Sequence, residues 1–275
     1  MRLLFGFRPL GSFQVSSFAT WPWALSSLLA LLGSLVVSLA QRQAEQRPPP
    51  LDPAQAKSEA RALVAELLAQ KPARNSTNTG QVRIRERDGK ESVIPVRFEI
   101  VCPATNWLSI YETLNPGGVK LVVTHADNQP NQYRLIERGG SGATNLSSRE
   151  LTSNQTMIPF AGSDFWVADL GLEFLHWPEQ RLLRKEMSHS KSCYVLESTN
   201  AASAPGGYAR VVSWIIIESP HGIIHADAYD ARNELIKLFD PVNLVKVHGD
   251  YQLDEVEMRN RKTGSHTWIK FNLVH

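Results

Sequence analysis

The sequence predicts a mainly β (α+β) fold in which helices cover one face of a curved antiparallel sheet. Residues 193–271 form a series of short segments rich in β-branched and aromatic residues, each bounded by Gly, Pro, Asn or Asp. One amphipathic helix precedes the strands, and its apolar stripe needs a surface to cover. At 275 residues, of which 43% are hydrophobic, the chain is long enough to bury a large core.

The first forty residues differ in kind from the rest. They hold two arginines and no acidic residue, and their apolar run Ala24–Ala40 ends in small side chains before polar Gln41. This pattern is typical of a secretory signal peptide over residues 1–40. The alternative is an uncleaved anchor in the inner membrane, because the run is only slightly shorter than the roughly 20 residues that span a bilayer.

Removal of this leader changes the charge of the protein. The whole chain has 29 basic and 27 acidic residues, so residues 41–275 carry 27 of each. A neutral chain gives no electrostatic reason to bind nucleic acid. We therefore expect no nucleic-acid partner.

The two cysteines, Cys102 and Cys193, leave two alternatives open. After export both would lie in an oxidising compartment, where a disulfide between them is one interpretation. Both also lie in apolar, strand-like segments, where buried free thiols are common. The sequence does not decide between the two.

A polar linker over residues 41–51 contains three consecutive prolines and leads to a helix over residues 53–71. Asp52 is a suitable N-cap, Pro53 suits the first helical position, and Pro72 ends the helix. The apolar stripe consists of Ala56, Ala60, Leu63, Val64, Leu67 and Leu68. We expect one domain over residues 52–275, formed by this helix and the sheet.

The strand pattern begins soon after the helix. The predicted strands cover residues 82–87, 92–101, 107–114, 120–125 and 133–137, with a tight hairpin turn at Asp88-Gly89. Pro95 suggests an edge or a bulge in the second strand. Residues 139–148 read as a flexible loop, because the Lys-Ser/Thr of a phosphate-binding loop does not follow the glycines.

Residues 157–177 contain the densest cluster of large apolar side chains after the leader. Ser163 or Asp164 is predicted to cap a short helix over residues 164–170. The cluster either plugs the core or forms the wall of an apolar ligand site. Further along, the segment around Trp214 is apolar on both faces, so both need a cover. The candidate wall residues are Phe165, Trp166, Leu170 and Trp214.

No catalytic, metal or cofactor motif is found, so we expect a protein that is not an enzyme and needs no cofactor. His225 and Asp227 share one face of a strand, but a metal site requires three or four converging ligands. A hydrolase using this pair is a distant alternative. Asp169 and Glu173 could serve as paired carboxylates, although a solvated surface is the simpler interpretation.

Several segments together resemble the outer-membrane lipoprotein-sorting protein (LolA-like) family. They are residues 162–170, 193–198, 208–214, 228–230, 235–237 and 257–260, followed by Thr263-Gly264 and Thr267. The resemblance implies an incomplete β-barrel whose open side holds helices, in a periplasmic protein that shelters the acyl chains of lipoproteins or another lipid-like ligand. Its other implied partner is the export machinery of the envelope. The rival hypothesis is an envelope structural or assembly module held by an uncleaved N-terminal anchor.

Overall fold

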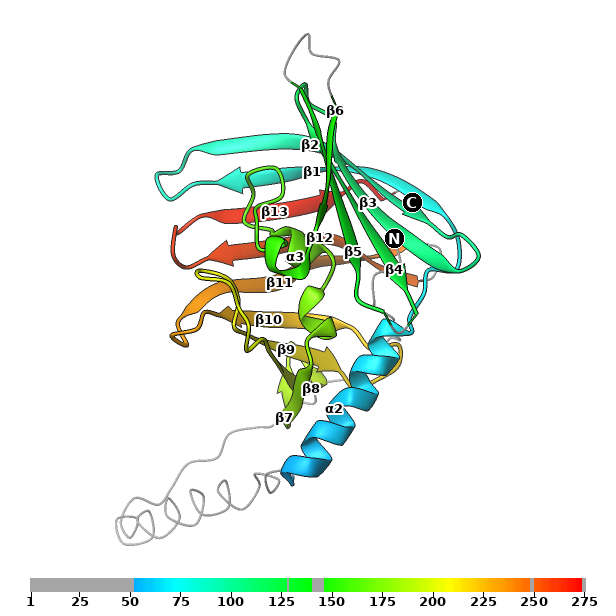
Figure 1. Cartoon of the computed structure of the whole chain (residues 1–275), viewed down its shortest axis with the longest axis vertical. Coiled ribbons are helices and arrows are strands. Elements are labelled where there is room, and N and C mark those ends of the chain that lie inside the picture. The colour runs from blue at the N-terminus through cyan, green and yellow to red at the C-terminus, as the bar shows by residue number, and fades with distance from the viewer. Residues whose placement is uncertain (1–51, 128, 140–145, 248–249, 274–275) are drawn as a thin grey trace, which may run out of the picture. The chain divides into compact units, whose positions relative to one another are not determined.

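One continuous antiparallel sheet of thirteen strands dominates the computed structural model, which describes residues 52–127, 129–139, 146–247 and 250–273 (Figure 1). The predicted signal peptide, the linker and the glycines at 140–142 lie outside the described residues. Within these ranges no helix is long and apolar enough to cross a membrane.

The strands follow one another along the chain. They are β1 Ser76–Arg85, β2 Glu91–Val101, β3 Asn106–Thr113, β4 Val119–Ala126, β5 Gln132–Arg138, β6 Leu146–Leu151, β7 Glu179–Ser188, β8 Lys191–Thr199, β9 Arg210–Ile216, β10 Ile223–Tyr229, β11 Leu235–Val247, β12 Asp250–Asn260 and β13 His266–Phe271.

Two meanders, β1–β6 and β7–β13, make up this sheet. They join where β1 pairs with β13, from Gly80 opposite Phe271 to Arg85 opposite His266. The free edges are β6 and β7, so the sheet does not close. In Figure 1 strands β3–β5 run steeply while β10–β13 lie nearly horizontal, which shows how strongly the sheet curves. The predicted curved, open antiparallel sheet is confirmed.

Helix α2 spans Pro53–Leu68 and ends slightly before the predicted residue 71. Asp52 caps it as expected, because its carboxylate accepts the backbone N–H groups of Ala54 and Gln55 at 3.0 and 3.1 Å. Five residues of the predicted stripe are buried: Ala56, Ala60, Leu63, Val64 and Leu67. The helix packs beside β7, and Glu66 pairs with His221 of the β9–β10 loop at 2.9 Å.

The segment 156–178, which we call the plug, connects β6 with β7 and contains α3 Val167–Leu170 and the 3₁₀ helix η2 Glu173–His176. The predicted cap at Ser163 or Asp164 is wrong, because Trp166 occupies the N-cap position. The backbone N–H of Trp166 donates to the carboxylate of Asp169 at 2.7 Å. Phe160, Phe165 and Val167 are buried in the main hydrophobic core with side chains from both meanders, so the plug belongs to the core.

The sequence missed both edge strands. β6 lies partly within the predicted loop, and β7 was not predicted at all; their outward side chains are mostly polar and exposed. β11 continues through register shifts between Pro241 and Leu244. Pro95 lies in an inner strand, yet β3 pairs only from Val96 onward, so β2 is locally an edge there.

Candidate ligand-binding cavities

A small apolar cavity, which we call the chamber, lies between the plug and the inner face of the sheet. Its volume is about 130 Å³. The plug contributes Phe165, Leu170, Leu172 and Phe174, and the apolar side chains from the sheet are Val211, Ile223, Ala226, Ala228, Phe239, Leu253, Val256, Met258, Ile269 and Phe271. The small side chains of Ala226 and Ala228 leave the wall thin on β10, in line with the alternation of strand side chains.

One buried lysine anchors the plug beside the chamber. The side chain of Lys237 is only 1% exposed. Its Nζ donates to the carbonyl oxygen of Asp164 at 2.6 Å, lies 3.7 Å from a carboxylate oxygen of Asp169 and 3.5 Å from the ring centroid of Trp166. Burial lowers the pKa of Lys237 to about 8, against the opposing charges of Asp169 and Asp164. Three groups of the plug therefore contact this ammonium group.

The carboxylate of Asp164 ties the same segment to the β12–β13 hairpin. It accepts hydrogen bonds from Asn260 at 3.0 Å, from Ser265 at 2.6 Å and from Thr267 at 2.9 Å. Asp169 is also buried, and burial raises its pKa while Lys237 opposes the change. Tyr208 donates to Asp169 at 3.1 Å and stacks on Trp166. This polar cluster holds the plug at one side of the chamber and leaves the cavity itself open.

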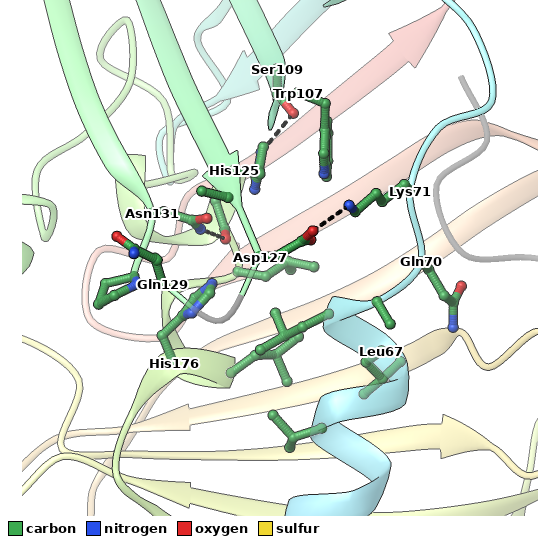
Figure 2. Close-up of a pocket in the computed structure, with 18 of the residues that line it drawn as sticks. Leu67, Gln70, Lys71, Trp107, Ser109, His125, Asp127, Gln129, Asn131 and His176 are labelled. Carbon is green, nitrogen blue, oxygen red and sulfur yellow. Dashed lines mark hydrogen bonds and ion pairs between the residues drawn. The ribbon is translucent and has the colours of Figure 1, made fainter. Parts of the chain in front are cut away.

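A larger cavity, the cleft, adjoins the chamber and has a volume of about 1180 Å³. It lies between the C-terminal part of α2 with residues 69–76, the ends of β3 and β4 with the turn after β4, and residues 170–178 (Figure 2). Tyr111, Leu170 and Leu172 line both cavities, so these three side chains form the boundary between them. The hydroxyl of Tyr111 donates to the carbonyl oxygen of Leu170 at 3.0 Å.

The lining of the cleft is mixed in character. Trp107 stacks on His125 with 3.7 Å between ring centroids, and Ser109 Oγ lies 3.0 Å from His125 Nε2. Burial lowers the pKa of His125 to about 4, so the imidazole is neutral at pH 7. Lys71 pairs with Asp127 at 2.7 Å between the end of α2 and the turn after β4 (Figure 2).

Two of the four predicted wall residues line the chamber and two do not. Phe165 and Leu170 line the chamber, and their contact with a ligand stays a prediction. Trp166 instead stacks on Tyr208 and contacts the ammonium group of Lys237. Trp214 lies on the opposite face of β9 from Val211, against Cys193, Ile216 and Ile224. The sequence could not choose a face here because the segment is apolar on both.

The two cysteines are free in the structure. Cys193 is buried on the outer face of the sheet, and Cys102 lies near Pro72, with 3.6 Å between its sulfur and the Pro72 carbonyl oxygen. Of the two alternatives left by the sequence, the structure contains the free thiols.

His225 and Asp227 do share a strand face, and a third residue joins them. His225 Nε2 lies 3.0 Å from Asp227, and Nδ1 lies 2.6 Å from Asp240, which also binds Arg259. Burial alone would lower the pKa of His225, but the hydrogen bonds and charges of both carboxylates raise it to about 9. A histidine held protonated by two carboxylates is a poor general base. No group of three metal-ligating side chains occurs among the described residues.

The interpretation of Asp169 and Glu173 as a solvated surface is wrong. Glu173 is buried and accepts a hydrogen bond of 2.6 Å from the hydroxyl of Tyr133, and the side chain of Asp169 is only 12% exposed. Sequence reasoning also missed Lys237. A signal was available, because Lys237 shares a strand face with Phe239, and both neighbours of this lysine in the sequence are apolar.

The fold resembles solved structures from three bacteria. A DUF1329 family protein from Desulfovibrio piger is 18% identical, with a TM-score of 0.63 over 79% of this chain and 91% of that one. A putative outer membrane lipoprotein-sorting protein domain from Vibrio parahaemolyticus is 16% identical, with a TM-score of 0.64 over 79% and 92%. A LolA superfamily protein from Nitrosomonas europaea is 18% identical, with a TM-score of 0.52 over 78% and 91%.

Sequence comparisons add less than the structural ones. A family model described only as "Uncharacterized protein" matches residues 146–275. No curated protein sequence matches the chain. The structural likenesses confirm the predicted LolA-like fold, and at these identities they show the fold alone.

Proposed function

From a LolA-like fold that encloses an apolar chamber, we propose that the protein is a non-enzymatic periplasmic carrier of acyl chains. The leader directs export and is then removed. The lipoprotein-sorting name of the Vibrio relative makes lipoprotein acyl chains the first candidate cargo, and the envelope export machinery supplies or receives it.

The chamber is the observation that supports this proposal most directly. Its apolar lining favours hydrocarbon over water, and each buried CH₂ group contributes about 0.8 kcal/mol. Its volume of about 130 Å³ holds only part of a long chain, and the adjoining cleft of about 1180 Å³ provides space for the rest. Carriers need such a site to be pre-formed, because a closed core would have to be broken at each loading step.

Organic extraction of the purified protein followed by mass spectrometry tests the cargo. The full chain is expressed in a Gram-negative host and purified from the envelope. Mass spectrometry of the purified protein also identifies its N-terminal residue. The proposal expects fatty acids, phospholipids or acylated peptides in the extract, and a chain that begins at Gln41. A lipid-free protein that also fails to take up added amphiphiles would favour an assembly module, and a retained leader would favour the anchored form.

A cavity-filling variant tests the place of binding. Ala228→Leu places a larger side chain at the thin wall of the chamber, so we expect it to weaken binding of a neutral fluorescent probe such as N-phenyl-1-naphthylamine. Val242→Leu is the matched control, because Val242 is 52% exposed and lies outside both cavities. Circular dichroism checks that both variants fold. Equal probe affinity in folded Ala228→Leu and in the control would contradict binding in the chamber.

A further inference from the structure

The cleft carries more positive than negative charge. The charged side chains in its lining are Arg61 of α2, Lys71, Arg74 and Asp127. Lys71 and Asp127 neutralise each other through their 2.7 Å ion pair. Arg61 and Arg74 form no ion pair or hydrogen bond through their side chains with any residue that the structure describes, and both are exposed. Two guanidinium groups therefore remain available at this cavity.

Most of the other arginines that the structure describes form ion pairs within the protein. Nine of those that the structure describes pair with a carboxylate: Arg83, Arg97, Arg134, Arg138, Arg181, Arg184, Arg210, Arg232 and Arg259. The guanidinium group binds carboxylate and phosphate oxygens in the same fork geometry. The unpaired arginines of the cleft are thus free to bind an anion that the protein itself does not supply.

The chamber cannot receive an anionic group. Among the residues described, Lys237 is the one cation in its lining, and its ammonium group is already bound to the Asp164 carbonyl oxygen and faces the Asp169 carboxylate. A second carboxylate or phosphate placed there would lie beside Asp169 in an apolar cavity, at a large desolvation cost. A charged ligand must therefore keep its head outside the chamber.

We propose that the ligand is an anionic amphiphile whose hydrocarbon tail occupies the chamber and whose carboxylate or phosphate head is bound in the cleft by Arg61 and Arg74. The tail passes the boundary formed by Tyr111, Leu170 and Leu172, which line both cavities. This inference rests on the proposed function, because it requires the chamber to bind acyl chains. It adds that the head group of the ligand is negatively charged and that this head group lies in the cleft.

Four amphiphiles with the same dodecyl tail test the head-group preference. They are dodecanoate, monododecyl phosphate, dodecyl maltoside and dodecyltrimethylammonium, each used below its micelle concentration to displace N-phenyl-1-naphthylamine from delipidated protein. We expect the two anions to bind about tenfold more tightly than the maltoside, which corresponds to two favourable surface ion pairs. The cation should bind most weakly, and added salt should remove most of the difference.

A pair of double variants locates the effect. Arg61→Gln/Arg74→Gln should weaken the binding of both anions about tenfold and leave dodecyl maltoside unchanged. Arg87→Gln/Arg149→Gln is the control, because it removes the same charge at two exposed arginines outside both cavities. It should leave all four affinities unchanged.

The possible failures are distinguishable. If none of the four compounds binds, the proposed function fails together with this inference. If all four bind with equal affinity, or if both double variants behave alike, acyl-chain binding stands and the anionic head-group site is refuted. A preference for dodecanoate indicates free fatty acids as the source of the head group, and a preference for monododecyl phosphate indicates phospholipids.

Discussion

At the scale of single residues, His225 shows how a candidate catalytic group becomes a structural one. It lies between Asp227 and Asp240, and Arg259 binds Asp240 from the other side. The sequence correctly placed His225 and Asp227 on one face, because they are separated by two positions in a strand. Asp240 and Arg259 come from β11 and β12, and only the register of these strands brings them to the histidine.

The stability of the fold should depend on the protonation of His225. Its pKa is about 9 in the folded protein, against 6.5 for an ordinary histidine, so the folded state binds the proton more tightly. The stabilisation is therefore fully present below about pH 6.5 and is lost as the pH rises through 9. The difference in urea midpoint between the wild-type protein and His225→Gln should shrink over that range.

The matched control is His189→Gln, which changes an exposed histidine. The difference in urea midpoint between His189→Gln and the wild-type protein should be small and should not change between pH 6 and 9.5. A pH-independent difference for His225→Gln would contradict a charged His225 in the folded protein.

At the scale of elements, the plug depends on polar anchors as much as on its apolar side chains. Lys237 holds it from β11, and the β12–β13 hairpin holds Asp164 through Asn260, Ser265 and Thr267. The aromatic cluster of the plug was predictable because large apolar residues crowd its sequence. The apolar neighbours of Lys237 gave a signal that this lysine is buried, but the partners of the anchors were not predictable, since each anchor joins the plug to a strand far away along the chain.

Removal of the lysine should therefore destabilise the protein strongly. Lys237→Met leaves the buried carboxylate of Asp169 without its cation, and we expect a loss of about 3 kcal/mol in the free energy of unfolding. Urea denaturation measures this loss. The double variant Lys237→Met/Asp169→Asn should recover part of it, because the second change removes the unpaired charge. A single variant as stable as the wild-type protein would show that the plug does not depend on this anchor.

The edge strands mark the limit of sequence reasoning at this scale. The inner strands alternate or carry continuous apolar residues, and most were located to within a few positions. β6 and β7 have a neighbouring strand on one side only, and most of their outward side chains are polar. Their strand character comes from pairing with β5 and β8 rather than from their own composition.

At the scale of the whole molecule, binding of a ligand in the chamber should stabilise the fold against unfolding. The chamber lining comes from β3, from β9–β13 and from the plug, so it exists only in the folded protein. A ligand present at about 100 times its dissociation constant then adds about 2.7 kcal/mol to the free energy of unfolding. Thermal melts of delipidated protein with and without dodecanoate measure the gain, which Ala228→Leu should reduce and Val242→Leu should not.

The sequence predicted the open curved sheet and its LolA-like fold, but only two of its four candidate wall residues lie at the chamber. Phe165 and Leu170 were identified because the plug is dense in apolar residues. The cleft was missed because its lining comes from α2, β3, the β4–β5 turn and the end of the plug, and none of these segments has a motif of its own. Sites assembled in this way become visible only when the curvature of the sheet is known.

The pairing of β1 with β13 has a consequence for how the protein folds. This pair is the only connection between the two meanders within the described sheet, and it joins the first strand of the chain to its thirteenth. Until residues 266–271 have been synthesised, the sheet exists as two separate halves, and the β12–β13 hairpin that binds Asp164 is incomplete. The pairing of β1 with β13 closes the longest loop in the sheet, and such distant contacts form slowly.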